Sequence, residues 1–278
     1  MASIKMIMTD LDGTLLNARR EMSEANKQAL HDCMARGIHV VLASGRSFES
    51  VKRLAAQYDI VGPIASVNGA RVDLSPAGPT IRSHTFPNDL ALQVFEIMKR
   101  SEIYFTCYGH GTLYKNNIFA AQDRVKGEKR LEAQMAMQTH RAELVVSDES
   151  RTLSEGLIEP YKFVAFSEDL PKLYALRHEL ERSGLALNVS SSWIDNVEVM
   201  VDGAGKDHAL WALCQHLCID PAEVMAFGDN LNDMDMLRAA GIGVAMGNAL
   251  DLVKAEAQLV APHHNESGLA QILREYVL

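Results

Sequence analysis

The sequence lacks the features that mark several large classes of protein. Only 4 of its 278 residues are cysteine, and they form no C-x-x-C motif, so nothing predicts a zinc site of that spacing. The net charge is -9, with no basic block, which argues against a nucleic-acid or anionic-membrane surface. The longest apolar stretches are too short to span a bilayer. A chain of 278 residues can bury a large core and is long for one simple domain, so two structural units are expected.

The cysteines and the first residues favour a cytoplasmic location. Cys214 and Cys218 are four residues apart on a predicted helix face, beside Leu210, Leu213 and Leu217, so we expect buried free thiols rather than a metal site. Free thiols suit a reducing cytoplasm. The chain passes almost directly into a strand, with no signal-peptide pattern. We therefore expect a cytoplasmic protein without nucleic-acid or membrane partners, and the sequence leaves its oligomeric state open.

Two carboxylates follow the first apolar run. Residues 4–9 predict a buried parallel strand. Asp10 and Asp12 come directly after it, and Gly13 allows a sharp turn. In open α/β sheets, ligands bind beyond the carboxyl ends of the strands. The pair therefore suits a nucleophile, a metal ligand and a general acid, although an isolated Asp-x-Asp-Gly could equally be a polar turn.

Three further segments show the same order of apolar strand and polar cluster. Residues 38–43 lead into Ser44-Gly45-Arg46, and residues 224–227 lead into Gly-Asp-Asn-Leu-Asn-Asp at 228–233. Residues 201–205 lead into Lys206, at the start of a predicted helix. A lysine at a helix N-terminus opposes the macrodipole. We therefore expect an anionic partner for Lys206, either phosphate oxygens or the carboxylates of Asp10 and Asp229.

With these four segments in order, the sequence resembles the haloacid dehalogenase (HAD) superfamily of phosphohydrolases, and within it the Cof-type sugar-phosphatase-like branch (subclass IIB). The resemblance covers about residues 1–82 and 190–278. It implies an Mg²⁺-dependent phosphatase that hydrolyses small phosphorylated metabolites, above all sugar phosphates, through an aspartyl-phosphate intermediate. In that mechanism Asp10 is the nucleophile, and Asp12 protonates the leaving oxygen and then deprotonates the attacking water.

Four carboxylates are predicted to converge, those of Asp10, Asp12, Asp229 and Asp233. Without a cation they would raise one another's pKa, and an all-oxygen ligand set with phosphate chemistry favours Mg²⁺. The resemblance implies that the ligands are the side chains of Asp10 and Asp229 and the backbone carbonyl of Asp12. Asp233 would bind through water or hold the other ligands. The segment that begins at Asp229 could, taken alone, be a capped helix start.

The remaining predicted site residues are phosphate or substrate contacts: Ser44, Gly45, Arg46, Asn68, Lys206, Asn232 and Asn265. The Ser44 hydroxyl and the backbone N–H groups of the following helix can hold phosphate oxygens, although an ordinary N-cap would by itself explain Ser44 better. Arg46 is expected either to contact the substrate or to be a solvated surface residue. Asn68 and Asn265 match family positions near the substrate, or are plain turn residues. Asp207 replaces the glycine that the family often has after the lysine.

The element order predicts an α/β fold with a doubly wound, mainly parallel Rossmann-like sheet core and an inserted α+β cap domain. The predicted parts are residues 1–86 and 188–278 for the core and residues 87–187 for the cap. The cap includes an expected helix at about 123–140 and would select the leaving group. Tyr108, His110 and Tyr114 could line a sugar pocket there, but packing and surface roles are favoured. His263 and His264 are expected to be a solvated loop pair.

Three alternatives to the sugar phosphatase remain open. A related phosphomutase would return the phosphoryl group to its substrate. A vitamin-type phosphatase would act on flavin mononucleotide or pyridoxal phosphate. A non-catalytic sensor of phosphorylated metabolites is disfavoured by the complete motif set, because binding alone does not need Asp12.

Overall fold

The computed structural model describes residues 3–109, 112–115, 143–146, 153, 155 and 157–278. The chain divides into two compact units: unit 1 comprises Met1–Ser83 and Gly205–Leu278, and unit 2 comprises His84–Ala204. Among the described residues, no helix is both long and apolar enough to cross a membrane. The expected helix at 123–140 and the side chain of His110 lie outside the described residues.

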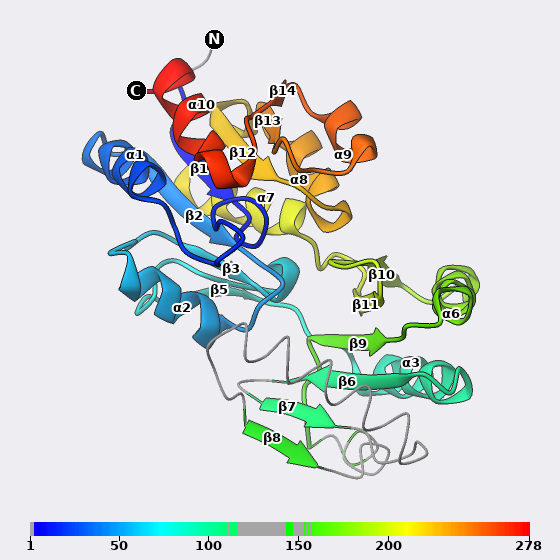
Figure 1. Ribbon diagram of the computed structural model, residues 1–278. Helices are drawn as coiled ribbons and strands as arrows, with labels where there is room; N and C mark the ends of the chain where they lie inside the picture. Colours follow the sequence, from blue (N-terminus) through cyan, green and yellow to red (C-terminus); the bar gives the residue numbers. More distant parts are fainter. Residues whose placement is uncertain (1–2, 110–111, 116–142, 147–152, 154, 156) are drawn as a thin grey trace. The chain divides into compact units, whose positions relative to one another are not determined.

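Unit 1 is built on an eight-stranded sheet (Figure 1). Its strands are β1 (Met6–Thr9), β2 (His39–Ala43), β3 (Ile64–Ser66), β4 (Arg71–Asp73), β5 (Thr80–Ser83), β12 (Val224–Gly228), β13 (Ile242–Ala245) and β14 (Leu259–Val260). They lie in the order β14-β13-β12-β1-β2-β3-β4-β5. The strands from β14 to β3 are parallel, and β4 and β5 add an antiparallel edge. The carboxyl ends of the central strands β1, β2 and β12 therefore meet at one edge of the sheet.

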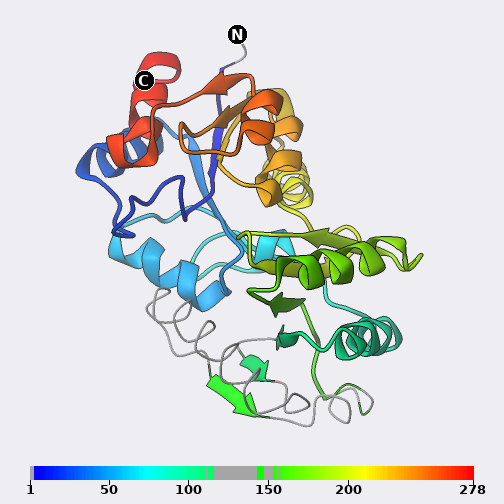
Figure 2. The same ribbon diagram turned by 45° about the vertical axis from the view of Figure 1, so that its right-hand side comes forward.

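Helices cover both faces of this sheet (Figures 1 and 2). They are α1 (Glu24–Ala35), α2 (Phe48–Gln57), α7 (Lys206–Leu217), α8 (Met234–Ala239), α9 (Asp251–Glu256) and α10 (Gly268–Tyr276), with the short 3₁₀ helices η1 (Val67–Gly69), η2 (Pro221–Glu223), η3 (Leu231–Asp233) and η4 (His264–Glu266). Side chains of a strand alternate between faces, so Ile7 of β1 packs in the cluster with α1 and α10. Met6 and Met8 pack in the cluster with α7 and α8. This doubly wound α/β sheet confirms the predicted fold class.

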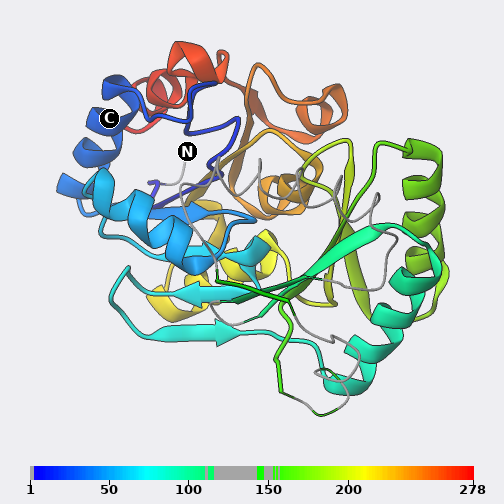
Figure 3. The ribbon, with the colours of Figure 1, turned by 60° about the horizontal axis from the view of Figure 1, so that its bottom comes forward.

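Unit 2 contains a six-stranded sheet in the order β10-β11-β9-β6-β7-β8. Its strands are β6 (Tyr104–Tyr108), β7 (Thr112–Lys115), β8 (Glu143–Val146), β9 (Lys162–Phe166), β10 (Leu187–Ser190) and β11 (Asn196–Val201). All neighbours pair antiparallel except β7 and β8. Helices α3 (Asn88–Arg100) and α6 (Leu170–Arg182) lie side by side (Figure 3). Phe95 of α3 meets Phe105 of β6 edge to face, with ring centroids 5.6 Å apart, which anchors the helix on the sheet.

The second boundary of the insert differs from the prediction. We expected the core to resume at residue 188, but β10 pairs with β11, and β11 pairs with β9 of the second sheet. Unit 2 therefore begins at His84 and ends at Ala204. The sequence pattern could not locate this boundary, because an apolar strand looks the same whichever sheet it joins.

The four cysteines are free thiols, as expected. Cys33, Cys107 and Cys214 are buried, but Cys218 is exposed, so the prediction of burial was wrong for that residue. Cys218 ends α7 in a left-handed conformation with φ 54°. The turn of the backbone there removes it from the apolar face that holds Cys214.

Candidate active site

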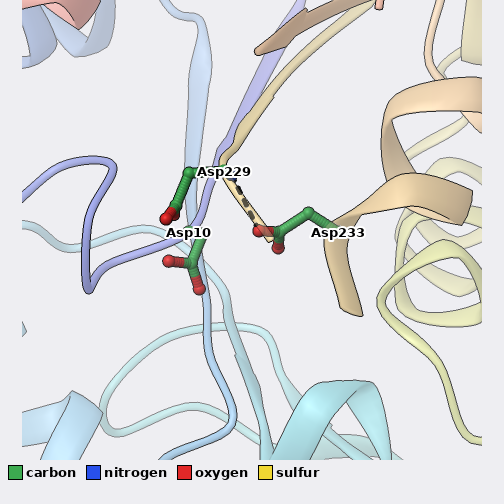
Figure 4. A group of neighbouring side chains, drawn as sticks. All are labelled: Asp10, Asp229 and Asp233. Carbon is green, nitrogen blue, oxygen red and sulfur yellow. Dashed lines mark hydrogen bonds between the residues drawn. The ribbon is translucent and has the colours of Figure 1, made fainter. Parts of the chain in front are cut away.

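Three carboxylates meet where β1 and β12 end. Asp10 follows β1 and Asp229 follows β12, and the two strands are paired up to Thr9 and Phe227. Asp233 closes η3, four residues beyond Asp229. Each of the three acids offers a carboxylate oxygen within 4.8 Å of the others (Figure 4). The structure thus brings together three of the four acids that the sequence predicted to converge.

Asp233 holds the backbone of the β12 loop. Its Oδ2 accepts a hydrogen bond from the backbone N–H of Asp229 at 2.9 Å (Figure 4). The same oxygen accepts from the backbone N–H of Asn230 at 3.0 Å. The residue is fully buried. Two fixed N–H donors leave this carboxylate little freedom, so Asp233 orients Asp229 as well as adding charge to the cluster.

Lys206 lies between two of the acids. Its Nζ is 2.5 Å from Asp10 Oδ1 and 2.6 Å from Asp233 Oδ1, and the side chain is buried. Burial alone would lower the pKa of Lys206, but the charges of Asp10 and Asp233 outweigh it and raise that pKa above its ordinary value. The lysine is therefore an ammonium ion. Its position at the start of α7 predicted an anionic partner, and Asp10 is one of those expected, but the second carboxylate is that of Asp233 and not that of Asp229.

One ammonium ion does not balance three carboxylates. Burial, with the charge of Asp233 and despite Lys206, raises the pKa of Asp10 to about 7. Burial and the charges of Asp10 and Asp233 raise the pKa of Asp229 to about 8, even though the Thr14 hydroxyl donates to its Oδ1 at 2.7 Å. The cluster lacks about two positive charges when fully ionised. Its all-oxygen donors and this charge deficit fit a hard divalent cation such as Mg²⁺.

Two glycines let the acidic groups approach the backbone. Gly13 has φ +87°, and a Cβ added there would lie 2.5 Å from Asp229 Oδ2. A Cβ on Gly228 would lie 2.4 Å from the Cβ of Asp233. Both distances are too short for a side chain without displacing a carboxylate. Glycine is thus needed at positions 13 and 228 for the acidic groups to take up this geometry.

Asp12 has a different partner from the other acids. Arg46 donates to both of its oxygens, from Nε to Oδ2 at 2.8 Å and from Nη2 to Oδ1 at 2.5 Å. The Arg46 side chain is 5% exposed and that of Asp12 is 28% exposed. A second cation, Arg20, lies 4.0 Å from Asp12 Oδ1. The expectation that Arg46 could be a solvated surface residue was wrong, and the charge of Asp12 is balanced outside the acidic cluster.

Ser44, Asn68 and Asn232, three of the predicted phosphate contacts, lie next to one another. Asn68 donates its backbone N–H to the Ser44 carbonyl oxygen at 2.9 Å. Its side-chain oxygen accepts from Asn232 Nδ2 at 3.1 Å. Ser44 is buried, and its hydroxyl accepts from the Arg46 N–H at 3.2 Å, with the half-buried Gly45 between them. The alternative that Ser44 is an ordinary helix cap was wrong, because the N-cap position of α2 belongs to Ser47.

The C-terminal loop supports the segment that follows Asp12. Asn265 is exposed, and its side chain accepts from the Ala18 backbone N–H at 2.8 Å. His264 Nδ1 lies 2.7 Å from the Leu16 carbonyl oxygen, to which it donates. Asn248 Nδ2 donates to the Gly13 carbonyl oxygen at 2.8 Å. The expectation of a solvated histidine pair was therefore wrong, since both rings are half-buried and His264 is bonded to this loop.

Sequence reasoning missed four residues that hold the site: Thr14, Arg20, Asn248 and His264. The contacts of Thr14, Asn248 and His264 join positions far apart in the chain; Asn248 and Gly13, for example, are 235 residues apart. Arg20 contacts Asp12 within the same loop region. A single asparagine or histidine in a loop carries no local pattern that distinguishes such a role. Thr14 could have been predicted from the sequence as a site residue, because it directly follows the Asp-x-Asp-Gly segment.

Known proteins are similar to this chain in sequence and fold. The family model described as haloacid dehalogenase-like hydrolase matches residues 7–273. 5-Amino-6-(5-phospho-D-ribitylamino)uracil phosphatase YcsE of Bacillus subtilis is 30% identical, over 99% of this chain and 96% of its own. Pyridoxal phosphate phosphatase YbhA of Escherichia coli is 27% identical, over 99% of both chains. Endoribonuclease YBEY, chloroplastic, of Arabidopsis thaliana is longer, and this chain spans 46% of it at 26% identity.

A solved structure shows the same architecture. A haloacid dehalogenase-like hydrolase from Bacillus subtilis superposes with a TM-score of 0.84 at 29% identity, over 99% of this chain and all of the other. The family match and the named phosphatases among the relatives confirm the predicted enzyme class, a phosphoric monoester hydrolase. On the strength of its four motifs, its sheet topology and these matches, the chain belongs to the haloacid dehalogenase-like hydrolases, in their Cof-type branch.

Proposed function

We propose that this enzyme is an Mg²⁺-dependent phosphatase of small phosphorylated metabolites, with sugar phosphates as its main substrates and Asp10 as its nucleophile. The observation that carries the proposal is the cluster of Asp10, Asp229 and Asp233, in which the buried Lys206 ammonium ion pairs with Asp10 and Asp233. Such a cluster is costly to a fold. It is explained if a cation and a phosphoryl group complete its charge balance.

The site residues fit a defined sequence of bond changes. A carboxylate oxygen of Asp10 attacks phosphorus, the bond from phosphorus to the leaving oxygen breaks, and Asp12 gives its proton to that oxygen. A water molecule then gives a proton to Asp12 and attacks the aspartyl-phosphate. The bond from phosphorus to Asp10 breaks and releases inorganic phosphate. The net reaction consumes one phosphate monoester and one water, and it yields an alcohol and phosphate.

Mg²⁺ would be held by the side chains of Asp10 and Asp229 and by the backbone carbonyl of Asp12, and when bound it supplies positive charge for the phosphoryl oxygens. Lys206 keeps the Asp10 carboxylate in place through its 2.5 Å contact. The buried Ser44 hydroxyl and the Asn68 and Asn232 amides, which adjoin one another, are proposed to hold phosphate oxygens. Asn265 is proposed to support the loop after Asp12 rather than to bind phosphate, because it bonds Ala18.

The named relatives differ in the leaving group of their substrates. One relative is named for pyridoxal phosphate and another for a phosphorylated ribitylaminouracil, so a vitamin-type substrate is the second candidate. We propose that unit 2 contributes to this choice, since the proposed phosphate-holding and metal-holding residues of the motifs, Asp10, Ser44, Lys206 and Asp229, all lie in unit 1. A phosphomutase uses the same nucleophile and differs only in the acceptor of the phosphoryl group.

A substrate panel tests the proposal. Inorganic phosphate release is measured with 5 classes of compound, namely hexose phosphates, pentose phosphates, nucleotides, flavin mononucleotide and pyridoxal phosphate, with Mg²⁺ and with EDTA, at a scale of about 1 μM to 1 mM substrate. We expect Mg²⁺-dependent release that is highest for a phosphosugar and absent in Asp10→Asn. A higher kcat/KM for a vitamin phosphate would select the second candidate. Transfer to a second sugar without phosphate release would select the mutase. Binding without turnover of any compound would overturn the proposed enzyme.

A further inference from the structure

We propose that Arg46 is a positioning residue, which orients Asp12 for proton transfer to the leaving oxygen and does not bind the substrate. The inference rests on the proposed phosphatase function. Arg46 was expected from the sequence to contact the substrate; in this proposal it contacts Asp12 instead. The geometry that carries it is the two-point contact between the Arg46 guanidinium and the Asp12 carboxylate.

The contact between Arg46 and Asp12 fixes the orientation of the carboxyl group as well as balancing its charge. Two parallel N–H donors, Nε and Nη2, meet the two oxygens of Asp12 at 2.8 Å and 2.5 Å. Such a fork holds the carboxyl group coplanar with the guanidinium and prevents rotation of the carboxyl group. Each carboxylate oxygen keeps a second lone pair beyond the one that Arg46 occupies. Asp12 can therefore carry a proton toward a substrate while it remains bound to Arg46.

Exposure separates the roles of the two residues. The Asp12 side chain is 28% exposed and can be reached by a substrate, whereas that of Arg46 is 5% exposed. The fork to Asp12 uses Nε and Nη2 of the guanidinium, and because the Arg46 side chain is 5% exposed, a phosphate group has little access to its remaining N–H donors. The accessible member of the pair is the acid, so the arginine acts through it.

The backbone of Arg46 is held as firmly as its side chain. Its N–H donates to the Ser44 hydroxyl at 3.2 Å, and its carbonyl oxygen accepts from the Val67 N–H at 2.9 Å. Val67 itself has φ 51°, a left-handed conformation that is rare for a β-branched residue. The loop after β2 is therefore tied to the turn after β3, and this gives the guanidinium a defined place from which to hold Asp12.

Leaving-group chemistry provides the test. A sugar alkoxide is a poor leaving group and needs the proton from Asp12 as the bond from phosphorus to oxygen breaks. The p-nitrophenolate ion is a stable anion and leaves with little need of a proton. Loss of a correctly placed general acid should therefore slow sugar-phosphate hydrolysis much more than p-nitrophenyl phosphate hydrolysis. A lost phosphate contact would slow both, because both substrates carry the same phosphoryl group.

The experiment compares Arg46→Ala, Arg46→Lys and Asp12→Asn with the natural enzyme on both substrates. General acid catalysis contributes about 10²–10⁴-fold, so we expect Arg46→Ala to lose about 10²-fold in kcat on the best phosphosugar and less than about 10-fold on p-nitrophenyl phosphate, with little change in KM. Arg46→Lys keeps the charge but not the fork and should show the same selective loss. Arg19→Ala is the matched control, since Arg19 is 81% exposed and pairs with Glu21 in the same loop.

A double variant and a fold check complete the design. Asp12→Asn with Arg46→Ala should be no slower on the phosphosugar than Asp12→Asn alone, because Arg46 acts only through Asp12. Circular dichroism and thermal unfolding identify any variant that fails to fold, and Arg46→Lys then decides the question. Equal losses on both substrates with a raised KM, or additive losses in the double variant, would overturn the positioning role. Retained p-nitrophenyl phosphate turnover in Arg46→Ala shows that the proposed phosphatase function stands independently of this outcome.

Discussion

Replacing Asp229 with asparagine should stabilise the metal-free protein at pH 8 while removing most of its stabilisation by Mg²⁺. The carboxylate is held beside Asp10 and Asp233, and its pKa is raised to about 8 by burial and by their charges. Asparagine has nearly the same shape and can still accept the hydrogen bond from Thr14, which is 2.7 Å long in this structure. The substitution therefore removes a charge that the metal-free fold accommodates poorly.

The size of the effect follows from proton linkage. The pKa of Asp229 in the fold is about 8, against an ordinary 3.8, so the folded state binds more protons than the unfolded state across this range. Its stability must then fall as pH rises from about 4 to about 8. At about 1.4 kcal/mol per pH unit, the difference between 3.8 and about 8 corresponds to at most about 6 kcal/mol. Protonation of Asp10 relieves part of the same repulsion, so we expect Asp229→Asn to gain about 2 kcal/mol at pH 8.

Thermal unfolding measures this difference. A gain of about 2 kcal/mol should raise Tm by about 5 °C in EDTA at pH 8, and the gain should shrink at pH 4.5, where the folded carboxyl group is protonated. Saturation with Mg²⁺ at 100 times Kd should add about 2.7 kcal/mol to the natural protein and much less to the variant. The matched control is Asp59→Asn, because Asp59 is 74% exposed and makes only a 3.7 Å contact with Lys27 in the same unit.

Two results would refute the reasoning. If Asp229→Asn were less stable than the natural protein in EDTA at pH 8, the acidic cluster would not be under electrostatic repulsion. If Mg²⁺ raised Tm equally in both proteins, Asp229 would not be part of the cation site. A change of the same size in Asp59→Asn would show that the effect is one of net charge and not of the cluster.

The remaining predictions concern turnover, metal choice and the second unit. Asp10→Asn should abolish turnover with the fold retained, because an amide is a poor nucleophile; phosphate release by the folded variant would contradict the mechanism. Mg²⁺ should support activity and Ca²⁺ should inhibit it, since Ca²⁺ accepts six to eight longer ligand contacts; equal rates with either ion, or full rates in EDTA, would count against this. In unit 2, Glu198→Ala should destabilise the fold by about 3–5 kcal/mol because it breaks a buried ion pair by removing the carboxylate. Lys162 Nζ lies 3.2 Å from Glu198 Oε1, with both side chains 2% exposed. Lys162→Met with Glu198→Leu should be destabilised much less, and denaturant unfolding of the single and double variants decides whether the cost is that of an unpaired charge.

Much of the acidic cluster was accessible from the sequence because of the geometry of parallel sheets. Strands such as β1 and β12 are short apolar runs, and the residues just beyond them must lie at one edge once the strands pair. Asp10 and Asp229 are therefore neighbours in space although they are far apart in the chain. The unusual lysine at the start of a helix likewise predicted an anionic partner, and Lys206 has two. Local patterns determined these placements, because each depends only on where a strand or a helix begins or ends.

The tertiary structure alone decided how the site is held together. Nothing in the sequence shows whether Arg46 is solvated or forms an ion pair with Asp12, since the two residues are 34 positions apart and lie in two different loops. The contacts of His264 with Leu16 and of Asn248 with Gly13 depend in the same way on loops from opposite ends of the chain. The boundary of unit 2 was hidden because β10 and β11 have strand patterns that either sheet could accept. Pattern and spacing in the sequence specify which reactive residues lie at a strand end. The hydrogen-bond partners of those residues are determined by long-range packing, which produces no periodic pattern in the sequence.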